Sequence, residues 1–240
     1  MTDYINQNFW RESLTKPDWY NLLLDDFKRL EKLAENEKDY DKRKAIKHDA
    51  FQSMVNAINE NRLPIAQTGD DLDFERKTID TIVIHHTNNK PGMKLDWLNA
   101  MQMILLYGKY YADKPDFRGS VWSGHFLGGK QVFWAYHWFI RQDGLAERIL
   151  DDKYIGWHAG NWDINTKSIA ICIDDDLNDK EPSDTVIKSI AKLIVDNYPN
   201  MKTEKIIGHC DVFDTKCPGR LFNESWKRKM INLIESRGNK

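Results

Sequence analysis

From residue 77 onward, short apolar runs rich in β-branched residues alternate with longer patterns of helical period, and this alternation limits the possible folds more than any other feature. The segments "TIDTIVIHH" and "KSIAICIDDDL" have the length and composition of buried strands. The segment "PSDTVIKSIAKLIVDNYP" is the clearest helix, because Ser183 can cap its start and Pro199 ends it. Strands that alternate with helices predict an α/β fold, with a mixed central β-sheet flanked by helices.

Four further segments complete this pattern. We expect a helix in "LDWLNAMQMILLYGKYYA", one aromatic-rich strand in "QVFWAYHWFIRQDG" that ends in an Asp-Gly turn, a short strand over residues 205–209, and a closing helix in "ESWKRKMINLIES".

The first 70 residues follow a different, helical and highly charged pattern. Two amphipathic stripes recur at helical spacing within residues 1–62, and "NRLPIAQTGDDLDFERK" then breaks the period with Pro64 and Gly69. We therefore expect a helical N-terminal extension over residues 1–70, ahead of an α/β domain over residues 71–240. The sequence leaves open whether the extension targets a substrate or partner, or only packs on the domain.

Charge and composition exclude several classes of protein. The 35 Lys and Arg residues against 37 Asp and Glu residues give no broad positive field, which argues against a nucleic-acid partner. No apolar run reaches the roughly 18 residues of a membrane-spanning helix. The start of the chain lacks the pattern of a secretory signal, so we expect cytoplasmic synthesis, with release or export by a signal-independent route left open. Three cysteines do not suggest a disulfide framework, and we expect a monomer.

Three residues that commonly bind metals fall at or just beyond the ends of the expected strands: His85, His209 and Cys217. Two imidazoles and one thiolate leave one tetrahedral position open, as in catalytic zinc sites. The residues alone also allow a simpler interpretation, in which the histidines are ordinary strand-end residues and Cys217 is a small buried residue in a turn.

Four segments in order, "TIVIHHT", "AYHWFIRQDG", "GWHAGNWDINTKSIAI" and "IIGHCDVFDTKCPG", resemble the successive motifs of the zinc-dependent N-acetylmuramoyl-L-alanine amidases of type 2. This group includes phage lysozyme-amidases and peptidoglycan recognition proteins, and the resemblance covers residues 77–236. It implies one Zn²⁺ ion, a peptidoglycan or muropeptide substrate, and hydrolysis of the amide between N-acetylmuramic acid and L-alanine.

The resemblance assigns the zinc ligands to His85, His209 and Cys217. Strand alternation agrees, because neighbouring residues point to opposite faces, so that His86 and Cys210 are not expected to be ligands.

The resemblance also assigns Tyr136 as a catalytic residue. Thr215 occupies a position where phage-type members have lysine and recognition-protein amidases often have threonine. The lysine stands one residue later, at Lys216, and we favour Thr215 as the donor to the oxyanion. His158 matches a histidine that lines the cleft and either binds substrate, assists proton transfer or holds a loop. The expected substrate-binding residues are Trp157, Asn161, Trp162 and Lys216.

Other positions and functions stay open at this stage. His125 and His137 match no family role and are expected to be structural, and Cys172 stands where some relatives carry a glutamate. One alternative function is a non-catalytic peptidoglycan-binding protein, and another is a structural zinc site closed by His158 or Asp211. The sequence does not distinguish a phage lysin from a recycling amidase or an exported effector, nor does it identify the third residue of the stem peptide.

Overall fold

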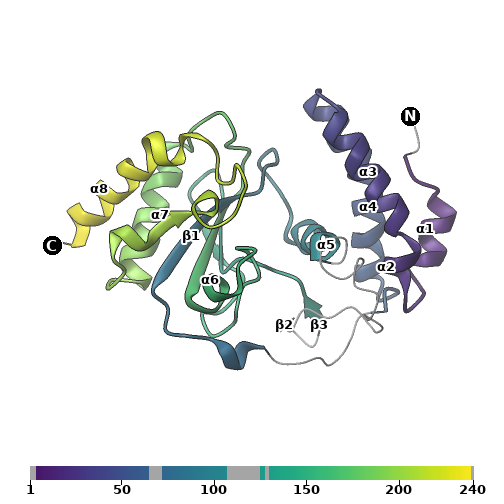
Figure 1. Cartoon of the computed structure of the whole chain (residues 1–240), viewed down its shortest axis with the longest axis horizontal. Coiled ribbons are helices and arrows are strands. Elements are labelled where there is room, and N and C mark those ends of the chain that lie inside the picture. Colours follow the sequence, from purple (N-terminus) through teal and green to yellow (C-terminus); the bar gives the residue numbers. More distant parts are fainter. Residues whose placement is uncertain (1–3, 65–71, 107–124, 128–129, 239–240) are drawn as a thin grey trace. The chain divides into compact units, whose positions relative to one another are not determined.

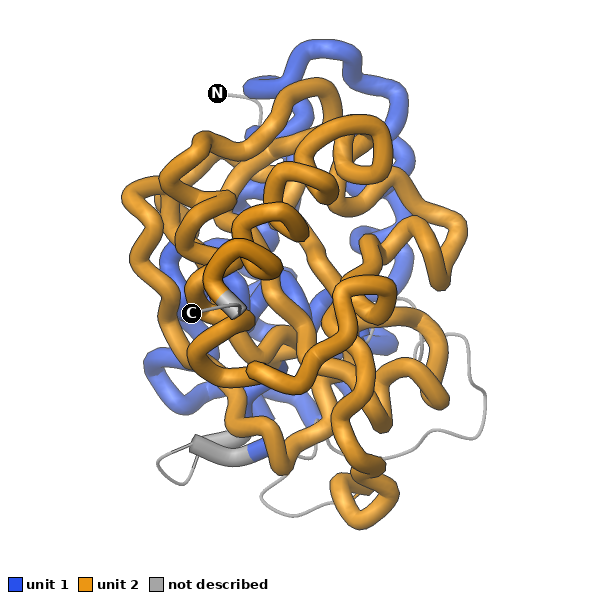
Figure 2. Tube along the Cα trace, turned by 90° about the vertical axis from the view of Figure 1, so that its left-hand side faces the viewer, with its two compact units in different colours: residues 1–70, 94–133 blue, residues 71–93, 134–240 orange. Residues whose placement is uncertain are grey.

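The computed structural model describes residues 4–64, 72–106, 125–127 and 130–238 (Figure 1). Its contacts divide the chain into two compact units, coloured blue and orange in Figure 2. Unit 1 contains residues 1–70 and 94–133, and unit 2 contains residues 71–93 and 134–240. The division places residues 94–133 with the N-terminal segment, and the domain boundary near residue 70 stays a prediction.

Unit 2 is built on a five-stranded sheet of order β5-β4-β6-β1-β7. β1 pairs in parallel with β6 and β7, β4 pairs in parallel with β6, and β5 is antiparallel to β4. The sheet is therefore mixed, which confirms the predicted fold class. The strands are β1 (Thr81–His86), β4 (Trp138–Ile140), β5 (Ala146–Arg148), β6 (Ser168–Ile173) and β7 (Ile206–Gly208).

The two central strands, β1 and β6, are buried along their whole length. Their register pairs Ile82 with Ile169 and Ile84 with Ile171, and these residues belong to the hydrophobic core that includes α7 and α8. Side chains alternate along a strand, so the opposite face of the sheet carries the remaining residues. The pairs on that face are Thr81 with Ser168, Val83 with Ala170, and His85 with Cys172.

The helices of unit 2 are α6 (Trp162–Lys167), α7 (Asp184–Asn197) and α8 (Lys227–Gly238). Helices α7 and α8 lie side by side against the sheet (Figure 1). Ser183 caps α7 by accepting a hydrogen bond from the Val186 N–H, as its position in the sequence predicts. The expected closing helix is also present, although its first turn, Phe222–Trp226, is a π-helix.

Short 3-10 turns flank the strands of unit 2 at Asp73–Glu75, Thr203–Lys205 and His209–Asp211. The expected strand over residues 205–209 is the shorter β7, and His209 lies in the turn that follows it.

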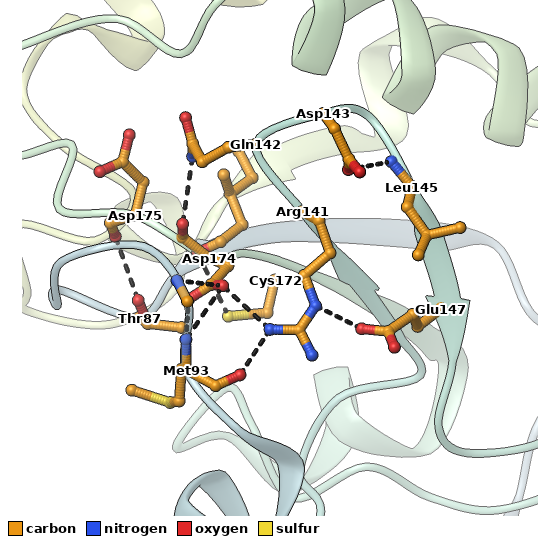
Figure 3. Close-up of polar contacts among 12 residues, drawn as sticks. Thr87, Met93, Arg141, Gln142, Asp143, Leu145, Glu147, Cys172, Asp174 and Asp175 are labelled. Atoms are coloured by element: carbon orange, nitrogen blue, oxygen red, sulfur yellow. Dashed lines mark hydrogen bonds and ion pairs between the residues drawn. The ribbon is translucent and has the colours of Figure 1, made fainter.

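A buried carboxylate fixes the segment that follows β1 in unit 2 (Figure 3). Asp174 directly follows β6 and is 1% exposed. Its oxygens accept hydrogen bonds from the Gly92 N–H (2.9 Å), the Met93 N–H (3.2 and 3.3 Å) and Arg141 Nη1 (2.9 Å). The Arg141 guanidinium also bonds to the Met93 carbonyl and the Glu147 carboxylate. One buried charge thus holds two segments that lie far apart in the sequence.

Unit 1 is mainly helical, which confirms the expected helical character of the N-terminal segment. Its apolar residues, Trp10, Trp19 and Tyr20 among them, form a core of their own. The elements are α1 (Gln7–Ser13), α2 (Trp19–Leu22), α3 (Leu24–Asn36), α4 (Tyr40–Asn59), α5 (Leu95–Leu106), β2 (His125–Leu127) and β3 (Lys130–Val132). None of the helices in the described residues is both long and apolar enough to cross a membrane.

Two expectations for the middle of the chain need comment. The helix expected over residues 95–112 is α5, and its last residues, 107–112, lie outside the described residues. The single strand expected over residues 131–144 is wrong. Its beginning belongs to β3, which pairs with β2, whereas β4 pairs with β6 in the main sheet. Two different pairing partners divide a segment that is continuous in composition. The Asp-Gly turn after β4 is present, with Gly144 at φ +87°.

Candidate metal centre

The candidate centre begins at the carboxyl end of β1, on the sheet face opposite the α7 and α8 core. His85 lies on this face and is 1% exposed, and Cys172 is its register partner on β6. His86 points the other way, where its Nδ1 accepts a hydrogen bond from the Leu177 N–H at 2.9 Å. The strand therefore directs only the first of the two histidines toward the centre.

Three expected ligands meet at this point. The ligand atoms of His85, His209 and Cys217 all lie within 4.8 Å of one another. Cys217 Sγ lies 3.7 Å from His85 Nδ1, and the rings of His85 and His209 are 4.6 Å apart between centroids. Two imidazoles and one thiol form a donor set that suits zinc and other transition metals. The residues thus fit a single ion with one coordination position left for another ligand.

Local hydrogen bonds bring Cys217 back beside His209. The Cys210 N–H donates to the Cys217 carbonyl at 2.8 Å, which closes the loop between them. The Cys217 N–H donates to Thr215 Oγ1 at 3.3 Å, and the His86 N–H donates to Cys217 Sγ at 3.4 Å. The Cys210 thiol instead contacts the side chains of Asp211 and Asn223, each at 4.0 Å. Only one of the two cysteines in this loop joins the cluster.

Desolvation disfavours charge on three groups at the centre, His85, His158 and Cys217. Desolvation lowers the pKa of His85 and of His158 well below the usual value for histidine, so both rings are neutral at neutral pH. Desolvation also raises the pKa of the Cys217 thiol to about 12. Without a bound cation, His85 and His158 are therefore neutral and the Cys217 thiol is protonated, so a bound cation would have to displace the thiol proton.

His158 contacts the edge of the His85 ring that does not face Cys217. Its Nδ1 is 2.9 Å from His85 Nε2, and its Nε2 is 2.9 Å from Ser168 Oγ. Its backbone N–H and that of Ala159 both donate to Asn165 Oδ1, at 3.2 and 2.9 Å. Both ring nitrogens of this histidine thus have partners inside the protein.

Of the expected catalytic residues, Tyr136 and Thr215 lie beside the ligands. The Tyr136 ring is 5.1 Å from the His85 ring between centroids, and the tyrosine hydroxyl is a hydrogen-bond partner of the buried Cys172 sulfur. Thr215 is half-buried and, as described above, bonds to the amide of Cys217. Lys216, the alternative donor, is an exposed residue of the same loop.

Three of the four expected substrate-binding residues, Trp157, Asn161 and Trp162, lie on the segment around His158 and at the start of α6, and the fourth, Lys216, lies in the Cys217 loop. The rings of Trp157 and Trp162 meet edge to face at 5.9 Å. Trp162 Nε1 donates to Glu75 at 2.7 Å, and Asn161 caps α6 by accepting from the Ile164 N–H. Asn161 and Trp162 are exposed. Their role in substrate binding stays a prediction.

His137 has the structural position that the sequence predicts. It is fully buried, its Nδ1 accepts from the Ala170 N–H at 3.0 Å, and its Nε2 bonds to the Tyr154 carbonyl at 3.0 Å. His125 is also buried and lies in unit 1.

Sequence reasoning missed Ser168, Asn165 and Phe213. The Phe213 ring stacks on the His209 ring at 5.6 Å between centroids and 17° between planes. It also lies against Gly160, where a Cβ atom would come within 2.7 Å of the ring. Strand alternation placed Ser168 on the same face as His85, and this was the signal that could have identified it. No local pattern indicates the contacts of Phe213 or Asn165.

A mixed sheet that brings two imidazoles and a thiol together at its strand ends defines an α/β protein with a candidate centre for one metal ion. The chain belongs to the N-acetylmuramoyl-L-alanine amidase family, whose model matches residues 75–220.

Individual relatives are distant. An endolysin of Enterobacteria phage T3 is 26% identical over 102 residues, which cover 40% of this chain and 66% of the endolysin, just under two thirds of its length. The 1,6-anhydro-N-acetylmuramyl-L-alanine amidase AmpD of Haemophilus influenzae is 23% identical over 158 residues, covering 56% of this chain and 85% of AmpD. Among solved structures, the endolysin amidase LysCS from Clostridium intestinale matches with a TM-score of 0.44 and 20% identity, over 66% of this chain and 86% of LysCS.

Proposed function

We propose that this protein is a zinc-dependent hydrolase of the amide bond between N-acetylmuramic acid and L-alanine, in peptidoglycan or in muropeptides. The observation that carries the proposal is the convergence of His85, His209 and Cys217 within 4.8 Å, inside a chain of the amidase family. When bound, zinc supplies a Lewis acid and an activated water for the attack on the amide carbonyl.

Thr215 is the better placed of the two candidate oxyanion donors. Its hydroxyl oxygen accepts the Cys217 N–H, which fixes the side chain beside the thiol and leaves the hydroxyl proton to be donated. Lys216 is exposed, and its long side chain would have to be ordered for each turnover. A donor that is held in place before the reaction stabilises the developing charge best, so we assign the role to Thr215.

Tyr136 is assigned a second donor role at the substrate carbonyl. Its ring lies against His85, and its hydroxyl is a hydrogen-bond partner of the buried Cys172 sulfur on β6. These contacts hold the phenol on the side of the sheet where the three ligands meet. Trp157, Asn161 and Trp162 are proposed to bind the sugar and peptide, because they lie on the segment that carries His158.

Two substitutions separate metal binding from chemistry. We expect Cys217→Ala to lose both bound zinc, measured by elemental analysis, and release of stem peptide from purified peptidoglycan, measured by mass spectrometry. Tyr136→Phe should keep the zinc and lower peptide release by about 10²–10³-fold. The matched control is Cys210→Ser, which alters the other thiol of the same loop and should retain both properties.

Unchanged peptide release by Cys217→Ala would refute the proposal. Binding of peptidoglycan without cleavage by the wild-type protein would instead support a non-catalytic binder. Side-by-side digestion of intact sacculi and soluble muropeptides then identifies the substrate form, which the relatives leave open because one is named an endolysin and the other an anhydro-muramyl amidase.

A further inference from the structure

We infer that Ser168, acting through His158, positions His85 as a metal ligand by holding it in the tautomer whose Nδ1 is free of a proton. This inference rests on the proposed metal centre. It assigns Ser168 and His158 as positioning residues, not as proton carriers.

The contacts form a continuous chain from the sheet to the centre. Ser168 Oγ lies 2.9 Å from His158 Nε2, and His158 Nδ1 lies 2.9 Å from His85 Nε2. The other nitrogen of the His85 ring, Nδ1, is the atom that faces Cys217 Sγ at 3.7 Å. The ring of His85 therefore has one side toward the metal ligands and the other toward His158.

Only two proton arrangements satisfy this chain, since each neutral imidazole carries one proton. In the first, His85 Nε2–H donates to His158 Nδ1, and His158 Nε2–H donates to Ser168 Oγ. In the second, Ser168 Oγ–H donates to His158 Nε2, and His158 Nδ1–H donates to His85 Nε2. The second arrangement puts the His85 proton on Nδ1 and removes the lone pair that a metal requires. Metal binding through Nδ1 selects the first.

Ser168 supports the first arrangement because it accepts the His158 Nε2–H in a place that water does not reach. Ser168 is fully buried and His158 is 7% exposed. Without the serine oxygen, this N–H would be a buried donor without a partner, which is unfavourable. The ring would then favour the tautomer with its proton on Nδ1, which opposes the proton on His85 Nε2. Removing the Ser168 hydroxyl should thus weaken the metal site, although Ser168 reaches His85 only through His158.

The backbone of His158 is fixed independently of its ring. Asn165 Oδ1 accepts the N–H groups of both His158 and Ala159, so the imidazole is presented from an anchored segment. Because both ring nitrogens are engaged, His158 has no nitrogen left to exchange a proton with substrate. The cleft histidine of the sequence motif is therefore assigned to support of the ligand.

The test measures zinc affinity of the full chain by competition with a chromophoric chelator. We expect Ser168→Ala to weaken zinc binding by about tenfold and His158→Leu by up to about 100-fold. His158→Asn should recover most of that loss, because the carboxamide oxygen can accept the His85 Nε2–H from a position close to that of the imidazole Nδ1. Activity of Ser168→Ala should return at saturating zinc.

The control is Thr166→Val, which removes another buried hydroxyl of the same segment, one that donates to the Asp163 carbonyl at 2.9 Å. It should leave zinc affinity unchanged. Circular dichroism of each variant establishes that it is folded before titration. Wild-type affinity in both Ser168→Ala and His158→Leu would overturn the inference while leaving the proposed function intact. Equal losses in His158→Leu and His158→Asn would overturn the hydrogen-bond mechanism. A wild-type chain that binds no zinc would overturn both proposals.

Discussion

Replacing Asp174 by alanine tests how much one buried carboxylate contributes to the α/β unit. The substitution removes acceptors from the Gly92 N–H, the Met93 N–H and Arg141 Nη1 (Figure 3). Breaking a buried ion pair from one side destabilises a protein by about 3–5 kcal/mol. The Arg141 side chain is 21% exposed and keeps its bonds to Glu147 and Met93, so the lower end applies. We expect a loss of about 3 kcal/mol, or roughly 6–12 °C in Tm.

The assay is urea unfolding of the metal-free protein, with a chelator present because bound zinc would stabilise the folded state. Asp174→Asn keeps one oxygen for the backbone donors, but it removes the charge and replaces the other oxygen with an NH2 group that cannot accept, so we expect about half the effect, roughly 1–2 kcal/mol. Asp179→Ala is the matched control, since this carboxylate pairs with Arg220 at 3.1 Å but is 85% exposed. Its urea midpoint should not change. If Asp174→Ala unfolds at the same urea concentration as Asp179→Ala, the buried contacts contribute no net stability and the reasoning is refuted.

Two further predictions concern the centre itself. Zinc binding should release about one proton, from Cys217, because burial holds the thiol pKa at about 12 in the metal-free protein whereas a metal ligand is a thiolate. Lower pH therefore opposes zinc binding, and zinc affinity should rise about tenfold per pH unit over roughly pH 6 to 8. Calorimetry in buffers of different ionisation enthalpy counts the released protons. A zinc affinity that does not change with pH would exclude the thiolate. Gly160→Ala should weaken both stability and zinc binding, because φ is +64° and the new Cβ would meet the Phe213 ring that stacks on His209. Gly92→Ala, at φ +100° with nothing within 4 Å, should lower stability alone, and equal zinc affinities in the two variants would contradict a role for Phe213.

The sequence allowed the central strands to be predicted because both are short apolar runs that are buried along their whole length. Continuous β-branched runs such as residues 81–84 have few alternatives to a buried strand. Alternation then places His85 and His86 on opposite faces, and the family resemblance selects His85 as the ligand. The helical cap at Ser183 was predictable for a similar reason, since a cap depends on residues within one turn. These features are local, and local sequence determines them.

The errors and omissions concern contacts between distant segments. Residues 131–144 look like one strand, yet β3 and β4 pair with different partners, and pairing depends on the rest of the fold. Ser168 is an unremarkable residue at the start of a strand until His158, ten residues earlier, reaches it across the sheet face. Phe213 acquires a role only because Gly160 has no side chain to displace it. Strand alternation can place Ser168 on one face of the sheet, but no short-range pattern identifies the partners that Ser168 and Phe213 meet.

A shared face of the sheet explains why the ligand His85, the supporting residue His158 and the proposed donor Tyr136 lie close together. His85 and its partner Cys172 end two parallel strands on the same face, and Ser168 begins one of them on that face as well. Cys172 contacts Tyr136 and Ser168 contacts His158, so β6 contacts two of the residues whose rings lie against His85 without supplying a ligand itself. A shift of β6 by one residue against β1 would turn both side chains into the α7 and α8 core. The parallel register of these two strands is therefore the single structural feature on which the geometry of the centre depends most.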